Sequence, residues 1–194
     1  MSQAIEEKET KQETSRIMTG TRAIATGARD AGVEVVSAYP ITPQTEVVEA
    51  IAEYVEGGSL DAEFSRVESE HSAMAGAIGA SQAGSRAFTA TASQGLLFMS
   101  EMVWWAAGSR LPIVMAVANR AIGPPWNIWG SHTDALSQRD AGWIQLFAAN
   151  VQEAYDLTLM AYRIAEDQDI MLPTMVNLDG FTLAETMQPY TLVD

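Results

Sequence analysis

The chain has 194 residues, of which 47% are hydrophobic and 19% charged, a balance typical of one globular domain with a full core. Twenty-five acidic residues against 11 basic ones give a net charge of −14. This charge argues against nucleic-acid binding, because a protein neutralises phosphate groups with a stripe of basic residues and the sequence shows none. The absence of cysteine excludes disulfides, thiolate zinc sites and iron–sulfur clusters bound by this chain.

Both lysines, Lys8 and Lys11, lie near the N-terminus, so the rest of the chain has none for a Schiff base or a P-loop. Pyridoxal enzymes, class I aldolases and P-loop nucleotide hydrolases are thereby excluded. No apolar run is long enough to span a bilayer, and the polar, acidic start is unlike a secretion signal. We therefore expect no membrane contact and a cytoplasmic location.

Residues 1–16 are polar and lack periodicity, which predicts a flexible N-terminal arm, and residues 17–194 are expected to form one body. In chain order the body reads as helix 20–31, strand 33–38, helix 43–56, strand 62–67, helix 72–83, strand 87–91, helix 96–107, strand 112–117, strand 143–148, helix 151–165 and strand 171–176. Strands that alternate with helices predict an α/β fold, a doubly wound and mostly parallel sheet with helices on both faces. In the helix of small residues, Gly76 and Gly79 would allow close packing on a neighbour.

The segment Tyr39-Pro40-Ile41-Thr42-Pro43 joins the first of these strands to a helix. Proline is favoured at the first helical position, so Pro43 is expected there and Thr42 at the N-cap. A helix N-terminus at the carboxyl end of a strand suits an anionic ligand, because free N–H groups and the positive end of the helix dipole meet there. A capped helix without any ligand is the alternative.

Polar residues follow two further strands of the predicted sheet, Ser93-Gln94-Gly95 after one and Asn119-Arg120 after the other. Ligands of open parallel sheets bind beyond the carboxyl ends of the strands. Arg120 directly after a buried strand must reach solvent, pair with a carboxylate or bind an anion, and its planar guanidinium is well matched to a carboxylate. Together with Thr42, it predicts a site for a ligand that carries a carboxylate.

Glu70 opens the small-residue helix, where a carboxylate normally pairs with the helix dipole and needs no further role. His71 and His132 have no partner at metal-ligand spacing, so no metal site is expected in this chain. His132 and Asp134, in the loop after Arg120, could help to line a site.

Five segments resemble the first domain of 2-oxoacid:ferredoxin oxidoreductases, the N-terminal part of the alpha subunit in multi-subunit members. They are Tyr39–Pro43, Ser69-Glu70, Phe88–Leu96 (FTATASQGL), Asn119–Ile122 and Leu178–Phe181. The similarity runs in order from about Gly20 to the C-terminus. The loop at 120–129 and the run at 139–143 resemble pyruvate enzymes (pyruvate synthase) more than 2-oxoglutarate enzymes.

The resemblance implies a thiamine-diphosphate-binding fold of the pyrimidine-side type, with the diphosphate and its Mg²⁺ held by another domain of the complex. In that family the glutamate at the position of Glu70 hydrogen-bonds the pyrimidine ring and activates the cofactor. By the same comparison Thr42 and Arg120 hold the 2-oxoacid. The residues that would line the cofactor are Tyr39, Pro40, Ile41, Ser93, Gln94 and Gly95.

The implied activity is the oxidative decarboxylation of a 2-oxoacid, expected to be pyruvate, with coenzyme A as acyl acceptor and ferredoxin as electron acceptor. The implied partners are the diphosphate-binding beta, gamma and cluster-carrying delta subunits. Alpha subunits of the family usually continue into a further domain, and this chain has neither the diphosphate motif nor cluster cysteines, so we expect it to be inactive alone. Two alternatives stay open: the pyrimidine-side half of a non-oxidative thiamine-diphosphate enzyme, and a non-catalytic assembly module.

Overall fold

The fold is organised around a six-stranded sheet of order β3-β2-β4-β5-β7-β6, in which every neighbouring pair is parallel. The computed structural model describes residues 15–125 and 127–192. The strands of this sheet are β2 (Val35–Ala38), β3 (Glu63–Arg66), β4 (Ala87–Thr91), β5 (Val114–Asn119), β6 (Ile144–Phe147) and β7 (Thr174–Asp179). A separate antiparallel ribbon joins β1 (Ser15–Met18) to β8 (Gln188–Thr191).

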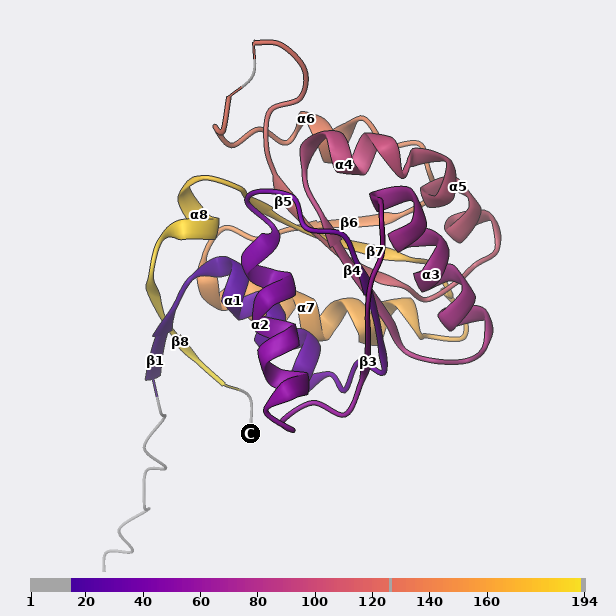
Figure 1. Cartoon of the computed structure of the whole chain (residues 1–194), viewed down its shortest axis with the longest axis horizontal. Coiled ribbons are helices and arrows are strands. Elements are labelled where there is room, and N and C mark those ends of the chain that lie inside the picture. The colour runs from indigo at the N-terminus through magenta and orange to yellow at the C-terminus, as the bar shows by residue number, and fades with distance from the viewer. Residues whose placement is uncertain (1–14, 126, 193–194) are drawn as a thin grey trace, which may run out of the picture.

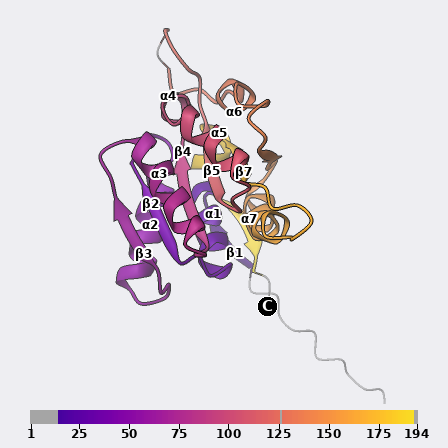
Figure 2. The same cartoon turned by 90° about the vertical axis from the view of Figure 1, so that its right-hand side faces the viewer.

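Helices cover both faces of the sheet (Figures 1 and 2), which confirms the predicted α/β class. They are α1 (Gly20–Asp30), α2 (Thr45–Glu56), α3 (Glu70–Gln82), α4 (Ser93–Phe98), α5 (Ser100–Gly108), α6 (Thr133–Leu136), α7 (Val151–Ala165) and α8 (Thr182–Glu185). Alternate residues of β5 enter opposite cores, because side chains of a strand point to the two faces in turn. Val114 and Ala116 pack with α1, α2 and α7, whereas Met115 and Val117 pack with α3 and α5.

The strand order reverses between β2 and β4. From β2 the chain first adds β3 on one side, and it then crosses to add β4 and β5 on the other. The β2–β4 ladder pairs Val35 with Ala87 and Val36 with Phe88 and goes no further, although β2 runs to Ala38 and β4 to Thr91. The two strands therefore separate toward their carboxyl ends, where open α/β sheets bind ligands.

Several element boundaries differ from the prediction. Helix α2 begins at Thr45 instead of Pro43, and the single helix expected at 96–107 is divided into α4 and α5 at Met99. The expected arm at 1–16 lies outside the described residues apart from positions 15 and 16, which belong to β1. Gly76 confirms the expected close packing, since a Cβ there would lie 2.5 Å from Ser37 Oγ, but Gly79 faces open space.

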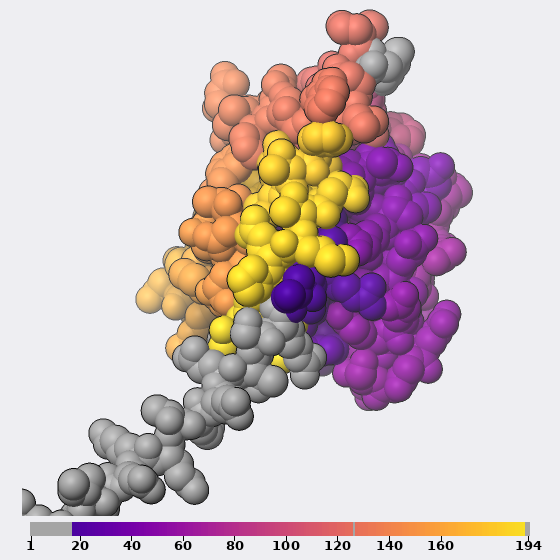
Figure 3. All heavy atoms as spheres, turned by 90° about the vertical axis from the view of Figure 1, so that its left-hand side faces the viewer, coloured from indigo at the N-terminus to yellow at the C-terminus, as the bar shows by residue number. Residues whose placement is uncertain are grey.

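The segment after β7 lies on the surface and carries the C-terminal end of the described chain, where β8 pairs with β1. Figure 3 shows it in yellow, bordered by the loop after β5 above it and by the N-terminal elements beside it. Tyr190 of β8 is buried against the same core as α1 and α7. Within the part of the chain that the structure describes, no helix is long and apolar enough to cross a membrane.

Candidate functional site

Arg120 connects all three strand ends that the sequence analysis singled out. Its Nη1 donates to the carbonyl oxygen of Thr42 at 2.6 Å, and its Nη2 donates to Gln94 Oε1 at 2.8 Å. The loop after β2, the start of α4 and the end of β5 therefore meet at one guanidinium. The predicted proximity of Thr42, Gln94 and Arg120 is confirmed.

The charge of Arg120 has no counter-ion among the described residues. No described carboxylate lies within ion-pair distance of it, and its Nε is buried without a hydrogen-bond partner there. Gln94 Nε2, next to it, is likewise buried without a described acceptor. Buried polar groups usually have a partner, so these two neighbouring donors are candidates for contacts to a ligand. The ion-pair explanation of Arg120 is not realised within the described structure, which leaves contact with solvent or an anionic ligand.

Thr42 does not cap α2, and this expectation is wrong. Residues 42–44 form a turn, α2 starts at Thr45, and the cap position belongs to Gln44, whose side chain makes no capping bond. The Gln44 side chain is fully buried and donates through Nε2 to Ala90 O at 2.6 Å and to Tyr39 O at 3.1 Å. This tether to β4 holds the turn in place of a cap. Thr42 instead contributes its carbonyl oxygen to Arg120.

Glu70 is the first residue of α3 and is only 7% exposed. Its helix is capped by Ser69, whose Oγ accepts from Ser72 N at 3.2 Å. No described residue donates a hydrogen bond to the Glu70 carboxylate, although a nearly buried carboxylate without donors is costly. The helix dipole offsets part of that cost. Water, or a ligand that donates a hydrogen bond, would offset the remainder.

Gly95 provides the space that Glu70 occupies. A Cβ at Gly95 would lie 2.5 Å from Thr91 Oγ1 and 2.8 Å from Glu70 Oε1, which is closer than a Cβ approaches atoms to which it is not bonded. Gly95 follows Gln94, which holds Arg120. Glu70 and Arg120 therefore approach consecutive residues, Gly95 and Gln94, at the start of α4.

The remaining predicted residues have structural contacts. Tyr39 accepts the Gln44 hydrogen bond through its carbonyl, Ile41 packs against the core beneath α1 and α2, and Pro40 is exposed. Ser93 has a left-handed backbone with φ of 50°, which is sparsely populated for residues other than glycine and often marks functional turns. The assignment of all these residues to a cofactor stays a prediction.

Asp134 has more contacts with the predicted site residues than the sequence indicated. It is fully buried, and its carboxylate accepts from Ser93 N at 2.9 Å, from Arg120 N at 3.0 Å and from Asn119 Nδ2 at 2.9 Å. The two histidines have other partners. His71 Nε2 lies 3.4 Å from Glu101, and the His132 ring packs on Phe147. Among the described residues no group of three or more acidic or histidine side chains could hold a metal.

A cavity of about 240 Å³ opens beside Arg120. It is lined by Thr42, Pro43, Arg120, Ile128, Gly180, Phe181 and Glu185. The ring of Phe181 packs edge-on against Trp129 at 4.6 Å between centroids, so the loop after β5 and the segment after β7 form one wall. Gly180 and Phe181 belong to a motif quoted above, whereas nothing in the sequence indicated Glu185.

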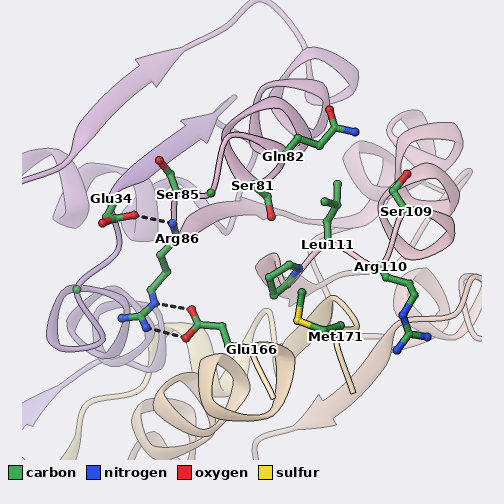
Figure 4. Close-up of a pocket in the computed structure, with 13 residues that line it drawn as sticks. Glu34, Ser81, Gln82, Ser85, Arg86, Ser109, Arg110, Leu111, Glu166 and Met171 are labelled. Carbon is green, nitrogen blue, oxygen red and sulfur yellow. Dashed lines mark hydrogen bonds and ion pairs between the residues drawn. The ribbon is translucent and has the colours of Figure 1, made fainter. Parts of the chain in front are cut away.

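A larger cavity, of about 780 Å³, lies at the opposite, amino-terminal ends of the parallel strands (Figure 4). There Arg86 forms a bidentate pair with Glu166 at 2.5 and 2.7 Å, and Glu34 accepts from Arg86 N. Hydrogen bonding to Glu166 raises the pKa of the Arg86 guanidinium. Because its arginine is already paired and none of the predicted residues lies there, we place the candidate substrate site at the smaller cavity, whose lining includes Thr42 and Arg120. Glu70 and the predicted cofactor residues do not line this cavity.

Comparisons with known proteins identify the family of the chain. Residues 26–194 match the family described as pyruvate flavodoxin/ferredoxin oxidoreductase, thiamine diphosphate-binding. Pyruvate synthase subunit PorA of Methanocaldococcus jannaschii is 55% identical over 177 residues, covering 91% of this chain and 46% of that protein. Ketoisovalerate oxidoreductase subunit VorA of Pyrococcus horikoshii is 54% identical over 184 residues, covering 92% and 46%.

Among solved structures, the chain resembles a 2-oxoglutarate:ferredoxin oxidoreductase from Magnetococcus marinus that was determined with 2-oxoglutarate, coenzyme A and succinyl-CoA bound. The TM-score is 0.84 at 29% identity, covering 94% of this chain and 32% of that one. The chain spans about half the length of the curated relatives it matches. On the family match and the identity to PorA, the chain belongs to the thiamine diphosphate-binding family of pyruvate flavodoxin/ferredoxin oxidoreductases.

Proposed function

We propose that this chain forms the pyrimidine-side wall of a thiamine-diphosphate site in an enzyme that oxidatively decarboxylates a 2-oxoacid to acyl-CoA and carbon dioxide, with electrons passing to ferredoxin. The observation that carries the proposal is the pair of unpaired donors, Arg120 Nε and Gln94 Nε2, beside a nearly buried Glu70 that has no described donor. One wall thus offers donors for a carboxylate and an acceptor for a ring N–H.

The described residues fit the cofactor on their own geometry. Glu70 would accept a hydrogen bond from the pyrimidine ring, and Gly95 leaves the space in which that carboxylate lies. The segments at 39–41 and 93–94 would line the ring. Bound thiamine diphosphate would supply an electron sink next to the keto carbon, so that carbon dioxide can leave. Arg120 and Thr42 would hold the carboxylate and keto region of the substrate in line with that centre.

Glu185 favours a substrate with a single carboxylate. It lies on the wall of the cavity that also contains Arg120, and no ion pair joins the two side chains in the described structure. A second carboxylate, as in 2-oxoglutarate, would meet like charge there, whereas Ile128 and Phe181 suit a small apolar side chain. Pyruvate is therefore the proposed substrate, and 2-oxoisovalerate, the substrate class in the name of the VorA relatives, is the second candidate.

Partner subunits would complete the site. Because the chain has no cysteine, the iron–sulfur clusters would belong to a cluster-carrying delta-type subunit, and the Mg²⁺ and diphosphate to a beta-type subunit. Helices α4 and α5, which follow the Ser93–Gln94 segment in the chain, expose Phe98 (59%), Trp104 (52%) and Trp105 (61%). Apolar surface of this kind is typical of protein interfaces and supports assembly with such subunits.

The test is Arg120→Ala in the assembled complex, assayed by ferredoxin reduction with pyruvate. Loss of a charged hydrogen-bond donor should raise KM for pyruvate about 10- to 100-fold. Arg139→Ala is the matched control, because Arg139 is exposed and pairs only with its neighbour Asp140 in the described structure. An unchanged KM for Arg120→Ala would remove the substrate-binding role.

The same preparation separates the alternatives. Release of carbon dioxide without any electron acceptor would favour a non-oxidative enzyme. If the complex binds no thiamine diphosphate by calorimetry, the chain is a non-catalytic assembly module.

A further inference from the structure

Asp134 carries a buried negative charge at the junction of three separate parts of the chain. It belongs to the four-residue helix α6 and is fully buried. Its Oδ2 accepts from Ser93 N, 41 residues away, and from Arg120 N, 14 residues away. Its Oδ1 accepts from Asn119 Nδ2 at 2.9 Å and from Ala135 N at 2.8 Å.

These bonds close a ring around Arg120. Asp134 Oδ2 holds the backbone N–H of Arg120 and of Ser93. Ser93 Oγ lies 2.5 Å from Gln94 Oε1, and the same Gln94 oxygen accepts from Arg120 Nη2 at 2.8 Å. Asp134 therefore holds the main chain of Arg120 directly and one end of its guanidinium through the Ser93–Gln94 segment, while the other end donates to Thr42 O.

The energetics favour a rigid arrangement. A desolvated carboxylate is tolerated only where donors compensate it, and Asp134 has four, two of them backbone N–H groups of site residues. Ser93 reaches this acceptor in a left-handed conformation, with φ of 50°. Such conformations persist where surrounding contacts over-determine them. The carboxylate thus holds the start of α4 and the end of β5 at a fixed separation.

If the Asp134 carboxylate served only to stabilise α6, it would not need hydrogen bonds outside this helix. The bond to Ala135 N is local, whereas three of the four bonds reach Ser93, Asn119 and Arg120, outside α6. Asn119 Nδ2 is shared with Asn177 Oδ1 at 3.2 Å, which extends the network to β7. The carboxylate is therefore directed at the strand ends on which the site is built.

We propose that Asp134 is a positioning residue that sets the orientation of Arg120 toward the carboxylate of the 2-oxoacid. This inference rests on the proposed function of Arg120. Asp134 touches neither substrate nor cofactor in this role, and it acts through the Ser93–Gln94 segment and the Arg120 backbone.

The experiment is a double-mutant cycle of Asp134→Asn and Arg120→Ala in the assembled complex, with KM for pyruvate and kcat measured separately. An amide places an N–H₂ where two donors now point, so Arg120 shifts. Asp134→Asn should raise KM about tenfold, because misplacement of a positioning group by an ångström costs up to about a hundredfold. If Asp134 acts through Arg120, the double variant has the same KM as Arg120→Ala alone.

Asp140→Asn, at an exposed aspartate six positions further on, is the matched control and should leave KM unchanged. If Asp134→Asn does not assemble, Asn119→Ala removes one donor from the same carboxylate and should give a smaller rise in KM. A fall in melting temperature with unchanged KM, or additive effects in the cycle, would overturn the inference. If Arg120→Ala itself is without effect, the proposed function fails instead, so the two failures are distinguishable.

Discussion

At the scale of single residues, the proposed site contains side chains whose polar atoms lack partners in the described part of the chain. The carboxylate of Glu70 has no donor, and Arg120 Nε has no acceptor, among the described residues. Buried polar groups without partners lower the stability of a fold. Here the two groups approach the consecutive residues Gln94 and Gly95, where a bound ligand would satisfy both.

Gly95→Ala tests this arrangement. The added Cβ would collide with Thr91 Oγ1 and with the Glu70 carboxylate, so Glu70 must move away from residue 95. We expect a loss of about 1–3 kcal/mol of unfolding free energy and weaker thiamine-diphosphate binding, measured by thermal melting and calorimetry on the assembled complex. Gly79→Ala in α3 is the control, since its Cβ would meet nothing within 4 Å. Equal cofactor affinity in both variants would contradict the assignment of Glu70.

At the scale of secondary-structure elements, the separation of β2 from β4 creates the site. Their ladder stops at Val36 and Phe88, and the Gln44 amide takes over beyond it by donating to Ala90 O. A side chain from the turn before α2 thus replaces a sheet hydrogen bond. The strands can diverge there without leaving the carbonyl of Ala90 unsatisfied.

Gln44→Met keeps the side-chain volume but removes both hydrogen bonds. Two carbonyl oxygens, those of Tyr39 and Ala90, then lose this donor in a buried setting, which should cost about 1–3 kcal/mol. For a domain of this size the melting temperature should fall by about 2–4 °C for each kcal/mol. Gln82→Met, at the exposed end of α3, serves as control. Identical melting temperatures for the two variants would show that the tether is dispensable.

At the scale of the whole molecule, the carboxyl and amino ends of the parallel strands have different roles. The carboxyl edge holds the unpaired groups of the site. The amino edge is held together by Arg86, which reaches Glu166 of the α7 terminus and the Ala31 carbonyl at the end of α1. Burial raises the pKa of Tyr162, whose ring lies under the same guanidinium, so it stays neutral at physiological pH.

Glu166→Gln should therefore affect stability and leave substrate binding alone. The pair is about one-third exposed on each side, so we expect a cost of about 1 kcal/mol that shrinks as salt is raised. KM for pyruvate should equal that of the unmodified complex, because this edge of the sheet is the one remote from Arg120. A raised KM would show that the two edges are coupled.

Much of the fold follows from the sequence alone. Buried apolar runs alternate with amphipathic segments, and this local periodicity determines a parallel sheet between two helix layers. The polar residues after the strands at 33–38, 87–91 and 112–117 then had to share one edge, because parallel strands end together. Arg120 and Gln94 could be expected there for that reason, and the family motifs assigned roles to Glu70 and Thr42.

Other features were decided only by the tertiary structure. Thr42 was expected to cap a helix, but Gln44 finds an acceptor 46 residues away in β4, and this long-range bond outweighs a local capping preference. Asp134 is inconspicuous in a polar loop and becomes important only when folding brings Ser93 N and Arg120 N to the same oxygen. Local sequence sets the periods of helices and strands, whereas the partners of buried polar groups depend on packing between distant segments. The parts of the site that rest on such partners could be known only from the folded chain.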